Sequence, residues 1–480
     1  MGNSINFSDT MSDSESLMWR VDADPALSSA FANVTILDRR PNMDALADQL
    51  NKSVDKFPRL GQRVIDHGTS APTWERVKNF DAHNHVKRIK LPPKSTIDDV
   101  MKLAVALCRD PLPRDRPLWE FISLEGLPKG QGAMVQRIHH AMADGEASVR
   151  MSLLFLDVAR QACELQPALK AGQGDPLPDE ANHDDIDDPI TATHTFDPLE
   201  LGATITAVGA GIGSFVTKFF SDPSRLARTA HTVTHWPSEL SHGIEMARSM
   251  LGQVYTDPAH SALWTERSLR RDFQVLEVPI EDAKHVANYL GGTLNDVFLT
   301  GVLSGAGKYH RAHNVFVDDL RVAIPISTRN KESGGNAFIP VRSLLPAGIV
   351  DPIALFAEVH DRLSVTKNDK TLPQLDKMLG IANVLPTNVL AAVAKQQAKS
   401  VDFAASNVRA APMELYIGGA KILRNYPMGP MSGTAFNITL LSYAGLLNIG
   451  IHIDTAAIPD GAFLRDCIAE AFDELIAVAR

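Results

Sequence analysis

The sequence predicts an α/β (α+β) protein with two similar layers of strands and helices, and three observations support this prediction. The chain has 480 residues, 44% of them hydrophobic and 22% charged, which fits a folded protein with more than one core. Residues 174–198 are rich in acids and proline and contain no Lys or Arg, as a solvated linker would. Short apolar runs alternate with amphipathic helical patterns on both sides of this segment.

The acidic segment divides the chain into three parts. We expect an N-terminal lobe over residues 1–165, an acidic linker and helical connector over residues 166–269, and a C-terminal lobe over residues 270–480. Regular strand and helix patterns end near the first boundary and return clearly near the second, which is why the boundaries are placed there.

In the N-terminal lobe, residues 98–108 carry apolar side chains at helical spacing and are predicted to form a helix. Residues 133–138 form a short extended run that is predicted to be a strand and that ends in two adjacent histidines. After Asp144, a positive φ at Gly145 would let the chain turn sharply and enter a helix over residues 149–158.

In the C-terminal lobe, residues 273–278 are predicted to be a strand, and residues 280–290 show one apolar helical face. A turn at residues 291–292 should precede a second helix. The Thr293 hydroxyl can cap that helix, and Asp296, three residues later, completes a capping-box pattern.

The charge balance and the cysteines exclude several classes of function. The chain carries 47 Lys and Arg against 57 Asp and Glu, a formal net charge of −10, which argues against nucleic acid as a partner. Cys108, Cys163 and Cys467 stand far apart, so they form neither a disulfide framework nor a zinc-site spacing. The N-terminus lacks the basic start and the apolar run of a signal peptide. We therefore expect a cytoplasmic protein.

The longest apolar stretch, residues 201–216, contains several glycines and hydroxyl residues and stops at Lys218. It is short for a membrane span. A packed glycine-rich helix and a helix lying in the membrane interface, over residues 201–220, are the two other interpretations.

His139 and His140 are the first candidates for chemistry. Neighbouring side chains on a strand point to opposite faces, so one is expected to enter a site and the other to support it. Opposed side chains also make a shared metal ion awkward, and we predict no metal site. A neutral imidazole suits a general base near neutral pH, although two packed core histidines fit the same residues.

The segment from His139 to Gly145 resembles the His-His-x-x-x-Asp-Gly motif of the CoA-dependent acyltransferase superfamily, and more closely that of the bacterial wax ester synthase/diacylglycerol acyltransferase family. The similarity runs in matching order from about residue 57 to the end. Further matching segments are Pro-Leu-Trp-Glu at 117–120, Asn-Asp at 295–296, Pro-x-Ser-x-Arg at 325–329, Gly-Asn at 335–336, Ser-Asn-Val at 406–408, Tyr-Pro-Met-Gly-Pro at 426–430 and Asn-Ile-Thr-Leu-Leu-Ser-Tyr at 437–443.

The resemblance implies two chloramphenicol-acetyltransferase-like lobes, each a mixed sheet with helices, around a central tunnel. It implies an enzyme that transfers a long-chain acyl group from acyl-CoA to diacylglycerol and, as a second activity, to long-chain alcohols. Acyl-CoA is then a substrate, and no cofactor is expected. The resemblance also allows peripheral attachment to the inner face of a membrane or to lipid droplets.

The resemblance assigns roles to the motif residues. His140 is expected to be the general base, with His139 as its support and Gly145 in the turn. Asp144 is expected to be structural and to pair with an arginine, for which Arg329 is the candidate. The alternative is a solvent-exposed Asp144 without a fixed partner.

Asn295, Asp296 and Trp119 are expected to lie around the substrate. Asp296 also has an explanation as a helix-start residue, and Trp119 fits a place in the core beside the site. The amide of Asn295 either orients a substrate carbonyl or binds backbone at the interface of the two lobes.

Two other functions fit the same sequence. A transferase of the same superfamily would act on a carrier-protein thioester or a polyketide alcohol, and a non-catalytic lipid-binding protein would coat membranes through residues 201–220. The sequence departs from the family pattern at residues 12–19 and 409–412, which bear on the acceptor entrance and on the preferred chain length.

Overall fold

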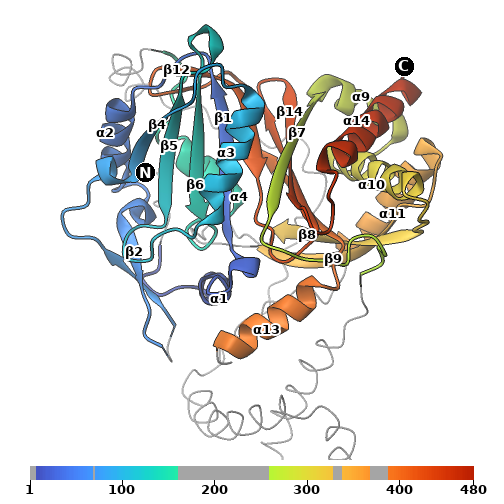
Figure 1. Cartoon of the computed structure of the whole chain (residues 1–480), viewed down its shortest axis with the longest axis horizontal. Helices are drawn as coiled ribbons and strands as arrows, with labels where there is room; N and C mark the ends of the chain where they lie inside the picture. Colours follow the sequence, from blue (N-terminus) through green and yellow to red (C-terminus); the bar gives the residue numbers. More distant parts are fainter. Residues whose placement is uncertain (1–6, 69–70, 161–258, 328–337, 368–386) are drawn as a thin grey trace, which may run out of the picture. The chain divides into compact units, whose positions relative to one another are not determined.

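Two six-stranded sheets make up the framework of the computed structural model (Figure 1). The structure describes residues 7–68, 71–160, 259–327, 338–367 and 387–480. These residues fall within one compact unit, formed by Met1–Ala162 together with Asp257–Arg480. The fold class predicted from the sequence, a mixed α/β protein, is confirmed.

The first sheet has the strand order β11-β12-β1-β6-β5-β4. Its strands are β1 (Ala30–Leu37), β4 (Val86–Lys90), β5 (Trp119–Glu125), β6 (Gly132–His139), β11 (Tyr416–Ile417) and β12 (Ala420–Met428). β1 is central and pairs antiparallel with β6 and β12, while β4 and β5 pair in parallel. The β1–β6 register places Ala30 opposite His139, so the histidine motif lies at one end of the sheet.

Helices cover the first sheet, and a small second ribbon accompanies it. The remaining elements of this half are α1 (Asp13–Val21), α2 (Met43–Ser53), α3 (Ile97–Arg109), α4 (Gly145–Ser152), the 3₁₀ turns Pro25–Leu27, Pro58–Gly61, Ala82–His85 and Pro128–Gly130, and the pair β2 (Gln62–Ile65) and β3 (Thr73–Arg76). α3 confirms the helix predicted over residues 98–108. It begins at a capping box, in which the Thr96 hydroxyl and the Asp99 carboxylate accept hydrogen bonds from each other's backbone amides.

Strand β6 contains the strand predicted over residues 133–138 and is buried along its whole length, including Gln136 and Arg137. Met134 and Ile138 join one hydrophobic cluster with residues of α2 and β5. Ala133 and Val135, on the other face, join a cluster with α3, which lies across the sheet in Figure 1, and with Phe273 of the second sheet. The strand that carries the motif is therefore held from both sides.

The second sheet has the strand order β7-β14-β13-β10-β8-β9. Its strands are β7 (Arg271–Pro279), β8 (Asp319–Ser327), β9 (Phe338–Pro346), β10 (Phe403–Arg409), β13 (Phe436–Tyr443) and β14 (Leu446–Asp454), and its helices are α9 (Ile280–Leu290), α10 (Leu294–Ala312), α11 (Pro352–Lys367), α13 (Thr387–Ala398) and α14 (Gly461–Val478). α10 and α14 approach closely because Gly305 faces the backbone of Ile468, where a Cβ would lie 2.5 Å from the Ile468 Cα.

The elements predicted at the start of the C-terminal lobe are confirmed. β7 contains the predicted strand 273–278, and α9 has the predicted bounds 280–290. Gly291 ends α9 in the left-handed region with a φ of 75°. α10 follows with the predicted capping box between Thr293 and Asp296.

The division of the chain into lobes differs from the sequence prediction at two places. β11 and β12 belong to the predicted C-terminal lobe, yet they complete the first sheet. Residues 259–269 were assigned to the connector, yet Trp264 is fully buried in the core of the second sheet. A pattern along the chain cannot show which sheet a strand joins, and this explains the first difference. The boundary near residue 165 lies outside the described residues.

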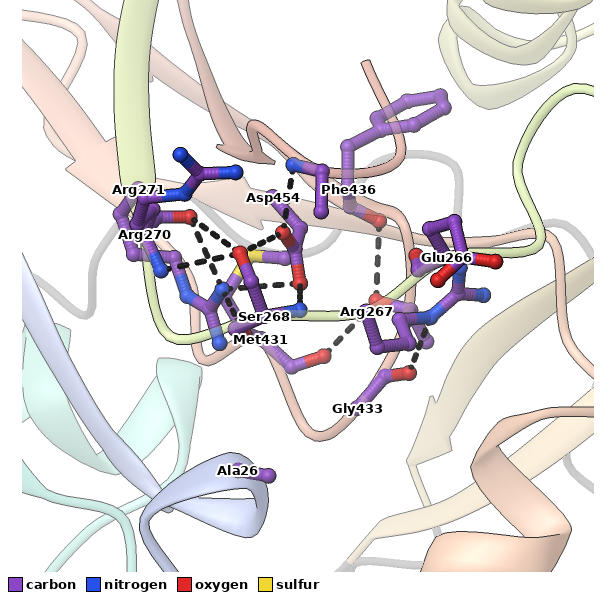
Figure 2. Close-up of polar contacts among 12 residues, drawn as sticks. Ala26, Glu266, Arg267, Ser268, Arg270, Arg271, Met431, Gly433, Phe436 and Asp454 are labelled. Atoms are coloured by element: carbon purple, nitrogen blue, oxygen red, sulfur yellow. Dashed lines mark hydrogen bonds and ion pairs between the residues drawn. The ribbon is translucent and has the colours of Figure 1, made fainter. Parts of the chain in front are cut away.

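A buried carboxylate, Asp454, fixes the segment that leads into β7 (Figure 2). It accepts hydrogen bonds from the Ser268 backbone amide and hydroxyl, at 2.7 and 2.6 Å, and lies 3.0 Å from Arg271 Nη1. Arg267 donates from Nε to the Gly433 carbonyl at 2.8 Å. These contacts bind residues 267–271 to the second sheet. Asp454 is 1% exposed, so its carboxylate has a structural role.

Several predicted features lie outside the described residues. They are Cys163, the apolar stretch 201–216, Arg329 and the Gly-Asn pair at 335–336. Among the helices that are described, none has both the length and the apolar character to cross a bilayer.

Candidate active site

The histidine motif begins where β6 ends. His139 is the last residue of the strand, and its backbone amide donates to the Leu118 carbonyl at 2.9 Å. The amide of the next residue, His140, donates to the Ser29 carbonyl at 3.0 Å, just before β1 begins. The backbone of the motif is thus fixed on two sides, and the two imidazoles leave it in different directions.

His140 is a partly exposed residue whose ring lies against an aromatic side chain. Its ring meets the Phe31 ring edge-on at 5.3 Å between centroids, and its Nδ1 atom is buried. Burial lowers the pKa of His140 to about 4; the nearby charge of Asp144 opposes this shift, and His139 adds to it. The imidazole is therefore neutral near neutral pH and can accept a proton, as a general base must.

His139 is buried and serves the turn that follows it. Its Nδ1 atom accepts a hydrogen bond from the Ala141 amide at 3.1 Å, and its Nε2 atom lies 3.6 Å from Asp22 Oδ2. Within the described residues, no group of three or more His, Cys, Asp or Glu side chains is placed to hold a metal ion.

Asp144 is a buried N-cap. Its side chain is 5% exposed and accepts a hydrogen bond from the Ala147 amide at 2.8 Å. The alternative of a solvent-exposed Asp144 is therefore wrong. The predicted partner, Arg329, lies outside the described residues, so their ion pair stays a prediction.

The turn after Asp144 differs from the prediction. Helix α4 begins at Gly145, four residues before the predicted start, because Asp144 caps it. Gly145 does not have a positive φ. Its lack of a side chain matters for space, since a Cβ would lie 3.0 Å from Cγ2 of Val408 in β10.

That contact brings the second sheet to the motif. Val408 follows Asn407, whose Nδ2 atom lies 3.5 Å from Oδ1 of Asn295 at the start of α10. Asn295 is partly exposed, and Asn407 is exposed. The structure therefore links Gly145, through Val408 and Asn407, to Asn295, which is the one predicted substrate-contacting residue that keeps an accessible polar group.

Asp296 and Trp119 have the structural roles that the sequence also suggested, at a helix start and in the core. The Asp296 carboxylate is 2% exposed and accepts from the Thr293 amide at 2.8 Å and from Nδ1 of His360 at 2.9 Å. The Trp119 indole is 1% exposed, donates to the Leu60 carbonyl at 2.9 Å and stacks on His85. Both side chains are thus buried and bonded to protein, and their predicted contact with a substrate stays a prediction.

Sequence reasoning missed four residues around the motif: Asp22, Ser29, Phe31 and Asn407. Of these, Asn407 could have been found, because it stands in the Ser-Asn-Val segment that resembles the family. The other three contact the motif from a distant part of the chain and carry no local signal of their own.

Comparison with known proteins identifies the family. The family model "wax ester synthase/diacylglycerol acyltransferase catalytic domain" matches residues 11–298, and the model of the C-terminal domain of the same family matches residues 334–476. A putative diacylglycerol O-acyltransferase of Mycobacterium tuberculosis (strain H37Rv) is 27% identical over 482 residues, covering 100% of this chain and 94% of the relative. A probable diacylglycerol O-acyltransferase of the same strain is 27% identical over 486 residues, covering 96% and 94%.

Solved structures show the same fold. The wax ester synthase/diacylglycerol acyltransferase from Marinobacter aquaeolei VT8 has a TM-score of 0.63 at 18% identity, covering 98% of this chain and 99% of its own. The first condensation domain of the calcium-dependent antibiotic synthetase has a TM-score of 0.56 at 16% identity, covering 99% and 97%. The chain therefore belongs to the wax ester synthase/diacylglycerol acyltransferase family and is an acyltransferase.

Proposed function

We propose that the protein transfers a long-chain acyl group from acyl-CoA to diacylglycerol and, as a second activity, to long-chain alcohols. The observation that carries the proposal is the neutral, partly accessible imidazole of His140 at the end of β6. The names of the mycobacterial relatives support diacylglycerol as the acceptor.

In the proposed reaction, Nε2 of His140 takes the proton from the acceptor hydroxyl, because Nδ1 is buried. The hydroxyl oxygen attacks the thioester carbonyl, and a C–O bond forms. The tetrahedral intermediate then collapses with cleavage of the C–S bond, and the imidazolium returns the proton to the CoA sulfur. The acyl group passes directly between the substrates, and no acyl-enzyme forms.

The lowered pKa of His140 suits the second half of this sequence. An imidazolium whose pKa is far below that of a thiol gives its proton readily to the departing thiolate. The first half depends on holding the hydroxyl against the ring, and a base of this kind contributes about 10²–10⁴-fold. Positioning of the two substrates and exclusion of water, which competes as acceptor, supply the rest.

The other residues have supporting roles in the proposal. The amide of Asn295, with Asn407 beside it, would orient the carbonyl of a substrate. Asp144 would pair with Arg329 and hold the turn that carries His140. A central tunnel between the lobes, a cytoplasmic location and peripheral attachment to membranes or lipid droplets complete the proposal.

The experiment that tests the proposal separates the products of radiolabelled palmitoyl-CoA by thin-layer chromatography. Diolein and hexadecanol are offered as acceptors to the wild type and to His140→Ala. We expect triacylglycerol from diolein, wax ester from hexadecanol, and loss of both products in the variant with an unchanged circular dichroism spectrum. Full activity of the variant contradicts the role of His140.

Two further arms separate the alternative functions. An acylated carrier protein replaces palmitoyl-CoA in the same assay, and efficient turnover with this donor alone favours the carrier-protein alternative. Binding to liposomes without turnover of any thioester favours a non-catalytic lipid-binding protein.

A further inference from the structure

We propose that Asp22 is a positioning residue, which holds both histidines of the motif in place from the end of helix α1. The inference rests on the proposed function of His140 as the base, because it concerns what orients that base. It concerns a residue outside the His-His-x-x-x-Asp-Gly motif, and none of the short matching segments named from the sequence contains it.

The two oxygens of the Asp22 carboxylate face two different parts of the motif. Oδ1 accepts a hydrogen bond from the Ser29 amide at 3.0 Å, and the Ser29 carbonyl accepts one from the His140 amide, also at 3.0 Å. Oδ2 lies 3.6 Å from Nε2 of His139. The same carboxylate is thus connected to the backbone of one histidine and to the ring of the other.

The hydrogen bond on the other side of the His139 ring determines its tautomer. Nδ1 accepts from the Ala141 amide at 3.1 Å, so the proton of the neutral ring must be on Nε2. Nε2–H is therefore buried next to the Asp22 carboxylate, 3.6 Å from Oδ2, a distance longer than a hydrogen bond that leaves an electrostatic contact. Because Ala141 follows His140 directly, this ring also fixes the backbone on the far side of the base.

Asp22 stays ionised in this position. Burial acts to raise its pKa, but the hydrogen bond from the Ser29 amide and the polar contact with the His139 ring outweigh burial, and the pKa of Asp22 is lowered overall. Arg114 adds a cation 3.3 Å from Oδ2 and lies over the Trp19 ring at 4.1 Å. These neighbours balance the negative charge of the Asp22 carboxylate where it is buried.

The turn that carries Asp22 is rigid enough to act as an anchor. α1 begins at a capping box between Ser12 and Glu15. At the other end, Val21 and Leu27 form a small buried cluster with Leu390 of α13. A fixed support of this kind matters because a displacement of about 1 Å at a reacting group can cost about 10²-fold in rate.

The test compares Asp22 with Asp24, which lies on the same turn. Asp24 also makes an ion pair, at 2.5 Å to Lys395 Nζ, and accepts from the Ala26 amide, but it does not touch the motif. We expect Asp22→Ala to lower kcat about 10²-fold and Asp22→Asn about tenfold, each with KM within about twofold. Asp24→Asn should leave kcat unchanged.

A double-mutant cycle with His139 shows whether Asp22 acts through that ring. We expect Asp22→Asn combined with His139→Gln to be no slower than His139→Gln alone. Additive losses, an equal loss in Asp24→Asn, or wild-type kcat in Asp22→Asn would each overturn the inference. If a lower assay temperature restores wild-type kcat to Asp22→Asn, the variant has lost activity only by unfolding. That result would also overturn the inference.

A spectroscopic measurement separates this inference from the proposed function. Long-range ¹H–¹⁵N spectra of the full chain with labelled histidine should show His139 protonated at Nε2. Asp22→Asn should shift the ring signals of His139 and His140, and Asp24→Asn should shift neither. If the wild type turns over no thioester, the proposed function fails, but these spectra still decide the inference: a proton on Nδ1, or unmoved signals, would refute it.

Discussion

His140, which follows β6 of the first sheet, and His452, in β14 of the second sheet, both have a pKa that burial lowers to about 4. His452 lies inside β14, donates from Nδ1 to the Gly429 carbonyl at 2.9 Å and meets the Phe273 ring edge-on. His140 follows the end of β6 and contacts Phe31. The two rings are alike in pKa and differ in where the chain places them.

This difference teaches that a lowered pKa alone does not identify the base. Burial lowers the pKa of any histidine, and His452 already has a role as a donor from β14 to the backbone that follows β12. His140 stands where three segments meet: the end of β6, the residues before β1, and β10 through the contact of Gly145 with Val408. His452 also joins the two sheets, but its ring does so by binding backbone, whereas at the His140 motif the contact is made by Gly145 and Val408.

The strongest test of the comparison replaces each histidine by glutamine. His140→Gln should lower kcat by about 10²–10⁴-fold, because glutamine cannot accept the proton in the transition state. His452→Gln should keep kcat within about tenfold, because the glutamine amide can still donate to the Gly429 carbonyl. Release of CoA measured with a thiol reagent, with palmitoyl-CoA and diolein, gives both rates.

Thermal unfolding of both variants is the control for this test. If His452→Gln loses as much kcat as His140→Gln while its Tm stays near the wild-type value, the site extends into the second sheet and the comparison fails.

The dependence on pH separates catalysis from stability. With a pKa of about 4 for His140, kcat should be nearly constant from pH 8 to pH 5 and fall toward pH 4 as the base becomes protonated. The folded pKa of both histidines lies below the ordinary value of 6.5, so the unfolded chain binds more protons between about pH 6.5 and pH 4. The free energy of unfolding should therefore decrease as the pH falls through this window.

The variant His452→Gln divides these two effects. It should reduce the loss of stability at low pH, seen in urea unfolding at pH 7 and pH 4.5, and leave the pH dependence of kcat unchanged. A shift of the kcat profile in this variant would mean that His452 takes part in the reaction.

Local patterns predicted the elements of this fold more successfully than their assembly. The capping box of Thr293 and Asp296 and the bounds of α9 are determined by a few neighbouring residues, and the sequence showed them. The entry of β12 into the first sheet depends on pairing with β1, some 390 residues away in the chain, as in the bond from Thr35 to Asn425. No periodicity within one strand contains that information.

The site shows the same limit. The motif singled out His140 and Asp144, but the start of α4 was placed too late because the capping role of Asp144 was not considered. Trp119 and Asp296 lie in matching segments, and the structure shows the protein partners of their side chains that no motif could specify. Asp22 was missed because its contact with His139 is formed only by the tertiary structure.

The smallest expected effect concerns Gly145, beside His140. In Gly145→Ala, the new Cβ would lie 3.0 Å from Val408 Cγ2, a side-chain atom that can move by a few tenths of an ångström. Gly145 is the first residue of α4, where alanine gains less over glycine than the roughly 1 kcal/mol of a helix interior, so Tm should fall slightly. The shift of β10 against α4 should lower kcat by a few fold, measured in the same CoA-release assay.

Val408→Ala relieves the crowding and supplies the matched control. In the double variant Gly145→Ala/Val408→Ala, the new methyl group meets open space left by the valine, and kcat should return toward the value of Val408→Ala alone. Failure of this rescue would show that glycine is needed at residue 145 for its backbone and not for the approach of β10. The contact between the two sheets would then be incidental to the base, and the position of His140 would depend on the first sheet alone.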